Sequence, residues 1–188
     1  MTGESLISYL SAIAKLSPTF LEDLESGIDE EQYKPHQIIH AAGQTENRLW
    51  FVERGFARSY YFDPTGKEHT LSFYLGNEII FSYKGYWKEP VDYYLEILTP
   101  SLLISLTYDS LYILERHEEA KSLIRTFIRQ RYYQELFKSR LMTWTAEERY
   151  HQYRKSHPEI FKLASIRLIA SYLNMTRENL SRLMGRES

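Results

Sequence analysis

The 188-residue chain is long enough for one large or two small domains, and its 43% hydrophobic and 15% aromatic content excludes an intrinsically disordered protein. Cysteine is absent, which excludes a disulfide framework, a thiolate zinc site and a cysteine-ligated iron–sulfur cluster. The charge is divided unevenly, since residues 1–118 hold nine basic and eighteen acidic residues whereas residues 119–188 hold fourteen basic and seven acidic ones.

Residues 5–28 predict two short helices that flank a larger domain. An apolar stripe at helical spacing marks the first helix, with Leu6, Leu10 and Ile13 on one face. Ser17 and Pro18 supply the N-cap and the first-turn proline of the second helix.

Residues 33–107 have the glycine spacing of an all-β segment. Gly43, Gly55, Gly66 and Gly76 are twelve, eleven and ten residues apart, and the stretch from residue 63 to 66 has a turn composition. Short β-type runs lie between and after these glycines: Arg48–Val52, Phe56–Phe62, His69–Leu75, Tyr93–Leu98 and Leu102–Leu106. This pattern predicts a β-barrel or jelly roll. Because no helical stretch is expected between the runs, a doubly wound α/β fold is excluded.

A helical period begins at Asp109. After a short helix to Arg116, a helix without glycine or proline is predicted from Glu118 to Met142. Apolar and amide residues recur along it at steps of four and three, as in a heptad seam: Leu123, Phe127, Gln130, Gln134, Phe137 and Leu141. We interpret this stripe as the seam of a symmetric dimer. The alternative is that it packs against the β-rich domain of its own chain.

Residues 163–184 contain the pattern of a helix-turn-helix. Thr145 and Glu148 form a capping box for a helix that precedes it. Ser165 can cap the first helix of the pair, and Asn174 tolerates the left-handed conformation of a tight turn. Thr176 can cap the second helix, which is the one that enters the major groove in this motif.

The second helix is expected to turn a polar face outward. Arginine can bond guanine O6 and N7, and glutamate can accept from cytosine N4, so we assign base reading to Arg177, Glu178 and Arg182. Phosphate contacts, which position the protein without reading sequence, are assigned to Thr176, Ser181, Arg167 and Arg186. An ordinary amphipathic helix pair is the alternative. The basic character of residues 119–188 favours duplex DNA.

The whole chain resembles the Crp/Fnr family of transcription regulators. Residues 49–58, LWFVERGFAR, are similar to the family's β-hairpin with its Gly-x-x-Arg, and GKE at 66–68 and GNE at 76–78 follow. Residues 176–182, TRENLSR, are similar to the family's recognition-helix motif. The resemblance is greatest to the short regulators of the Bacteroidetes type.

This resemblance implies an α+β chain in three parts: a cyclic-nucleotide-binding-like jelly-roll sensor (a double-stranded β-helix) with flanking helices over 1–116, a dimerisation helix over 117–144, and a helix-turn-helix DNA-binding domain over 145–188. It implies a cytoplasmic homodimer that reads a roughly palindromic operator and has RNA polymerase as a further partner. Six residues, 159–164, leave little room for a β-hairpin wing, so we expect a short wing or none. The sequence has no run of about 18 apolar residues and no signal peptide, so no membrane partner is expected.

The expected ligand site departs from the family pattern. The cyclic-nucleotide cassette opens with Gly-Glu and holds an arginine for the phosphate, but this chain has GNE at 76–78 and no basic residue over 90–94. Burial of an anion without a cation is costly, so we expect no binding of cyclic AMP in the family's usual way and no cofactor. Aromatic residues and one acid gather there instead, as a pocket for an unidentified flat or apolar molecule or as simple filling of a vacated pocket: Glu78, Phe81, Tyr83, Tyr93 and Tyr94.

Two other classes of function stay open at this point. One is a jelly-roll module that binds a ligand or a protein but no DNA. The other is a cupin-like metal enzyme, which would need a His-x-His pair and an acid on adjacent strands. The six histidines do not form that pattern, so we expect no metal, no catalytic residue and no enzyme.

Overall fold

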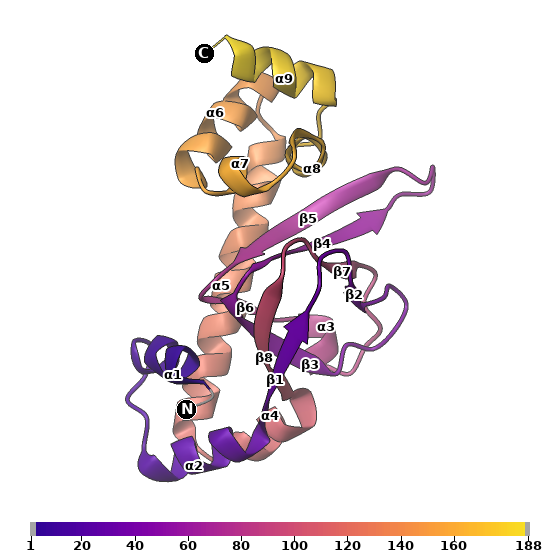
Figure 1. Cartoon of the computed structure of the whole chain (residues 1–188). Helices are drawn as coiled ribbons and strands as arrows, with labels where there is room; N and C mark the ends of the chain where they lie inside the picture. The colour runs from indigo at the N-terminus through magenta and orange to yellow at the C-terminus, as the bar shows by residue number, and fades with distance from the viewer. Residues whose placement is uncertain (1–2, 187–188) are drawn as a thin grey trace.

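The computed structural model describes residues 3–186 and has two antiparallel sheets, a long helix and a C-terminal helical region (Figure 1). One sheet has the strand order β1-β8-β3-β6 and the other the order β2-β7-β4-β5. The strands are β1 (Ile28–Tyr33), β2 (Ile38–His40), β3 (Arg48–Arg54), β4 (Phe56–Phe62), β5 (Glu68–Leu75), β6 (Glu78–Ile80), β7 (Tyr94–Ile97) and β8 (Ser101–Thr107). The predicted α+β fold with a cyclic-nucleotide-binding-like jelly roll is confirmed. We call these eight strands the β-roll.

The helices lie before, beside and after the β-roll (Figure 1). They are α1 (Glu4–Ser11), α2 (Pro18–Gly27), α3 (Tyr83–Tyr86), α4 (Tyr108–Leu114), α5 (Glu118–Met142), α6 (Ala146–Ser156), α7 (Ile160–Leu163), α8 (Ile166–Tyr172) and α9 (Arg177–Gly185). The Ser17 hydroxyl accepts from the Phe20 N–H at the start of α2, as the cap prediction requires. No helix among residues 3–186 combines the length and the apolar character needed to cross a bilayer.

Strand β3 is buried on both faces, which explains its unbroken apolar run. Trp50 and Val52 point into the core between the two sheets. Leu49 and Phe51 point the other way and pack with residues of α1, α2, α4 and α5. Because successive side chains of a strand alternate between its faces, this one strand joins the core of the β-roll to the helices.

The turn from β3 to β4 requires glycine at residue 55. Gly55 has φ of 120°, and an added Cβ would lie 2.7 Å from the Cα of Ser101. Both the backbone conformation and the space therefore exclude a side chain. This turn brings Arg58, three residues later, into the sheet between β5 and β7, where Glu68 and Glu96 lie.

Three strands and two short helices, α3 and α7, lie outside the sequence-based assignment. The short β2 and β6 and the acidic β1 were not predicted. The expectation that no helical stretch separates the strands is wrong, because the single turn α3 lies between β6 and β7. One turn is too short for the crossover of a doubly wound fold, so the fold class is unaffected.

Helix α5 has the predicted bounds, but its apolar seam turns inward. Leu123 and Phe127 are 4% and 5% exposed and belong to the core formed with α1, α2 and α4. Leu141 is fully buried against the C-terminal helices, and Phe137 packs beside it. The structure thus corrects the predicted dimer seam. The apolar residues of the seam pack within their own chain, which was the alternative. Of the six seam residues only Gln130 and Gln134 are exposed.

The C-terminal helical region has its own core. Tyr150, Tyr153, Ile169, Leu173 and Leu180 are buried in it together. The capping box at Thr145 and Glu148 is present at the start of α6. The segment 159–164, expected to hold a short wing or none, contains the helical turn α7, and residues 145–186 include no strand.

Candidate nucleic-acid interface and sensor cavity

Helices α8 and α9 form a helix pair whose ends are set by local capping. The Ser165 hydroxyl accepts from the Leu168 N–H, and the Thr176 hydroxyl accepts from the Asn179 N–H. Asn174 has φ of 49°, the left-handed conformation expected of the turn residue. The N-terminus of α9 is therefore capped by a neighbouring residue of the same helix end. This is the end that a recognition helix presents to bases.

The outer face of α9 is open to solvent over its whole length. Leu180 and Leu183 are buried, whereas the residues assigned to base reading and most of those assigned to phosphate contact are exposed: Thr176, Arg177, Glu178, Ser181, Arg182 and Arg186. The Arg182 guanidinium donates to the Asn179 side chain at 3.0 Å, one turn away on the same face. We call this set the α9 face.

Arg167 lies apart from the α9 face. Although its side chain is 65% exposed, the guanidinium contacts Glu68 of β5 at 3.2 Å. Glu68 also pairs with the buried Arg58 at 2.7 Å, and Arg58 pairs with Glu96 of β7 at 2.6 Å. The predicted phosphate contact of Arg167 therefore competes with an ion pair to the β-roll.

The β-roll docks on α8 through its strand β5. The Ser171 hydroxyl donates to the backbone oxygen of Glu68 at 3.1 Å and accepts from the Thr70 N–H at 2.8 Å. Lys138 of α5 donates to the backbone oxygens of Thr70 and Leu71. One hydroxyl and one ammonium thus fix the register of β5 against the helices.

Substitution of Ser171 by alanine should loosen this docking. The change leaves the Thr70 N–H without its acceptor, and the free energy of unfolding should fall by about 1–2 kcal/mol. Hydrogen exchange followed by NMR should show a faster Thr70 amide in the variant. Ser181→Ala on the exposed α9 face is the matched control, and equal Thr70 exchange in both variants would contradict the docking role.

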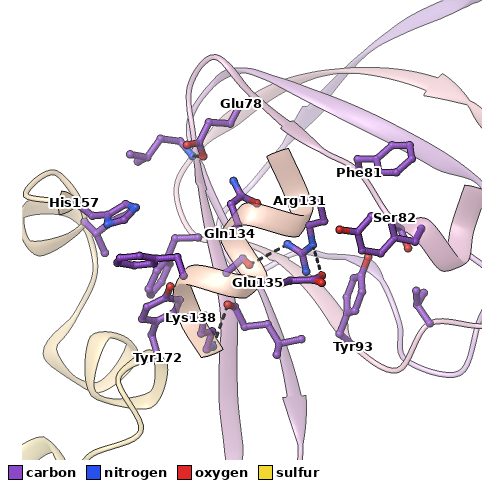
Figure 2. Close-up of a pocket in the computed structure, with 18 of the residues that line it drawn as sticks. Glu78, Phe81, Ser82, Tyr93, Arg131, Gln134, Glu135, Lys138, His157 and Tyr172 are labelled. Carbon is purple, nitrogen blue, oxygen red and sulfur yellow. Dashed lines mark hydrogen bonds and ion pairs between the residues drawn. The ribbon is translucent and has the colours of Figure 1, made fainter. Parts of the chain in front are cut away.

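A cavity of about 370 Å³ lies between the β-roll, α5 and the C-terminal helices. Figure 2 shows Arg131, Gln134 and Lys138 of α5 along one side, with Ser82 and Tyr93 opposite and His157 and Tyr172 at the end nearest the helix pair. Glu78, Phe81, Tyr83 and Tyr93 line this cavity as the sequence predicted. Tyr94 does not, because its ring stacks on Tyr60 at a centroid distance of 5.2 Å.

Two comparisons place this architecture among known proteins. Residues 30–117 match the cyclic nucleotide-binding domain family. A putative transcriptional regulator of the Crp/Fnr family from Eubacterium rectale superposes with a TM-score of 0.72 at 15% identity, covering 95% of this chain and 87% of that one.

The chain has the Crp/Fnr regulator fold. FixK2 from Bradyrhizobium japonicum has a TM-score of 0.73 at 18% identity over 85% of this chain and 83% of its own. The c-di-GMP-responsive regulator CLP of Xanthomonas campestris has a TM-score of 0.69 at 14% identity, covering 90% of this chain and 91% of that one. Comparison with curated protein sequences gave no match. The resemblance to the Bacteroidetes type stays a prediction.

Within this Crp/Fnr fold, the cations of the cavity come from α5. Arg131 and Lys138 are both partly buried there, seven residues and about two helical turns apart. Neither residue lies over 90–94, where the family pattern places its cation, so neither was predicted. Their spacing of seven residues places them on one face of a helix, which the sequence does show. That this face lines a cavity is clear only from the packing of the β-roll against α5.

A buried carboxylic acid lies behind the cavity of the Crp/Fnr fold. Glu46 is fully buried, and its Oε2 accepts from the Tyr93 hydroxyl at 3.2 Å. Its Oε1 has no partner among the described residues. Burial raises the pKa of the Glu46 carboxyl to about 8, against an ordinary value of 4.5.

This shift predicts a loss of stability as the pH rises. Between pH 4.5 and 8 the folded chain holds a proton on Glu46 that the unfolded chain has released, so the stabilisation is complete below that window and lost through it. From pH 6 to 8 the free energy of unfolding should fall by about 2 kcal/mol more in the wild type than in Glu46→Gln. Denaturant unfolding at several pH values should show this difference in slope, and Glu22→Gln, an exposed control, should keep the wild-type slope. An unchanged slope in Glu46→Gln would contradict the assignment.

The described residues contain no group of three His, Asp or Glu side chains arranged to hold a metal ion. The expectation of no metal site stays a prediction.

Proposed function

We propose that this chain is a DNA-binding transcription regulator that reads a roughly palindromic operator as a homodimer. The observation that carries the proposal is the α9 face, where Arg177, Glu178 and Arg182 are exposed on a helix with a capped N-terminus. A helix of this kind fits the major groove, where arginine and glutamate discriminate between bases. The regulators with the same fold support this function.

A dimer is proposed along a different face of α5 from the predicted seam. Tyr132 is 56% exposed, and Ile128 lies one turn before it beside the exposed Arg125 and Arg129. These four residues line a shallow groove together with Trp87, which is 58% exposed. Exposed aromatic side chains of this size favour an interface. A two-fold axis along α5 would place the two α9 helices for major grooves about 34 Å apart.

The proposed regulator does not bind cyclic AMP in the family's usual way. The family's pattern takes the cation for the phosphate from the segment over 90–94, which in this chain holds Asp92 and no basic residue. RNA polymerase as a partner, a cytoplasmic location and the absence of enzyme activity follow from the proposed function. Titration of the protein with cyclic AMP by calorimetry tests the ligand part, and tight binding would overturn it.

Selection of bound sequences from random duplex DNA tests the DNA-binding part. We expect enrichment of a two-fold symmetric site, with affinity that falls steeply as salt concentration rises because bound cations are released from the phosphates. The competing function is a ligand- or protein-binding module without DNA binding. It predicts no enriched sequence and no salt-dependent affinity.

A further inference from the structure

Lys138 is a partly buried cation without a counter-ion. Its ammonium donates to the backbone oxygens of Thr70 and Leu71 and lies 4.3 Å from the centre of the Tyr172 ring. No carboxylate of the described residues pairs with it. Burial and the nearby charge of Arg131 lower the pKa of Lys138 to about 7. A cation in this state is stabilised by any anion that reaches it.

Arg131 supplies a second set of donors to the same cavity. Its Nε donates to Glu135 at 2.9 Å, and one terminal nitrogen donates to the hydroxyls of Ser72 and Tyr74 at 3.1 Å each. The other terminal nitrogen has no acceptor among the described residues. Arg131 and Lys138 lie seven residues apart on α5 and line the same cavity (Figure 2).

Most of the charged side chains that line the cavity balance one another in ion pairs. Lys84 pairs with Asp92 at 3.3 Å, and Arg131 pairs with Glu135. Lys138 and Glu78 remain. The Glu78 carboxylate accepts from the Leu75 N–H at 2.7 Å, whereas Lys138 has only backbone oxygens and the Tyr172 ring as partners among the described residues. One cation of the cavity is therefore open to a singly charged acid, which suits a monoanion better than a phosphate with two charges.

The rest of the lining is apolar and aromatic. Phe73, Phe137, Tyr153 and Tyr172 contribute aromatic surface, and Leu71 and Ile160 contribute aliphatic surface. The volume of about 370 Å³ lies in the range of small-molecule sites. A flat aromatic body fits this surface, whereas a free inorganic ion would leave most of it without contacts.

We infer that this cavity binds a small aromatic carboxylate, with its carboxylate held between Arg131 and Lys138 and its ring against the aromatic wall. Part of that wall, His157 and Tyr172, belongs to the C-terminal helices. The ligand therefore contacts the β-roll, α5 and the helix pair at once, beside the docking contact at Ser171. Its effect on DNA binding rests on the proposed function, but the binding itself does not.

Calorimetry on the full chain with 2-naphthoate and its neutral twin 2-naphthamide tests the inference. We expect 2-naphthoate to bind at least tenfold more tightly than 2-naphthamide, with no binding of inorganic phosphate. Lys138→Met should weaken 2-naphthoate at least tenfold. Lys88→Met, which removes an exposed cation outside the cavity, should leave its affinity unchanged.

Equal binding of the two compounds, no binding of either, or full affinity in Lys138→Met would overturn the inference. If Lys138→Met fails to fold, the wild-type comparison of the acid with the amide still decides the question. These measurements contain no DNA, so they separate this inference from the proposed function. Binding of 2-naphthoate by a chain that selects no DNA sequence would refute only the regulator, and the reverse result would refute only the ligand site.

Discussion

Replacement of Arg58 by methionine should lower the free energy of unfolding by about 3–5 kcal/mol. The guanidinium is only 3% exposed and pairs with Glu68 and Glu96 on the strands beside it. It also donates to the hydroxyl of Thr70 and lies 4.2 Å from the Tyr60 ring centre. Removal of the cation leaves Glu68 with only the exposed Arg167 and Glu96 with only the exposed His36 as charged partners. Loss of one member of a largely buried ion pair is strongly destabilising, because the remaining charges are poorly compensated.

Denaturant unfolding followed by circular dichroism measures this change. Lys88→Met is the matched control, because Lys88 also pairs with a carboxylate but is 62% exposed. An exposed pair contributes at most about 1 kcal/mol, so the control should stay near the wild type. A loss below about 1 kcal/mol in Arg58→Met would show that the β-roll does not depend on this cluster.

The double substitution Arg177→Ala and Arg182→Ala should abolish sequence preference in DNA binding. Each arginine that reads a guanine contributes roughly 1–3 kcal/mol of discrimination, so affinity for the selected operator should fall about 30-fold or more. Affinity for random duplex DNA should fall much less. Fluorescence anisotropy with operator and scrambled duplexes at fixed salt measures both values.

A control with the same change in net charge separates base reading from general attraction. Lys155→Ala with Lys162→Ala removes two exposed cations from α6 and α7, away from the α9 face. This variant should weaken both duplexes alike and modestly, because its cations contribute only non-specific attraction. If the arginine variant also lost affinity equally for operator and scrambled DNA, the base-reading assignment would be wrong.

Features set by local sequence were predictable from the chain alone. The caps at Ser17, Thr145, Ser165 and Thr176 depend on residues at most three positions away, and all four are present. The bounds of α5 followed from its lack of helix breakers. The exposed polar face of α9 was predictable from the helical spacing of its apolar residues.

Features set by a distant partner were not predictable in the same way. The heptad-like stripe on α5 showed that Leu123 and Phe127 are buried but not by what, and the partner proved to be the chain's own helices. Strand β1 has an acidic sequence with no strand signal. It forms because it pairs with β8 along its whole length and because Glu31 pairs with Arg48 of β3.

The cavity contains both kinds of residue, those predictable from local sequence and those brought there by a distant part of the chain. Glu78, Phe81, Tyr83 and Tyr93 were found because they cluster in the sequence after β5. Arg131 and Lys138 come from a helix about 40–60 residues further along the chain, and only the packed structure brings them to the aromatic wall. Tyr94 follows Tyr93 directly in the chain and points to the opposite side of its strand, as strand geometry requires.

Strand β5 is the last strand of its sheet, and its outward-facing amide and carbonyl groups could accept a strand from another molecule. Ser171 and Lys138 occupy these groups at Glu68, Thr70 and Leu71. The helix pair thus also shields the β-roll from edge-to-edge aggregation. A fragment that ends after α5 should keep the ammonium of Lys138 but lose the hydroxyl of Ser171, and we expect it to self-associate through β5.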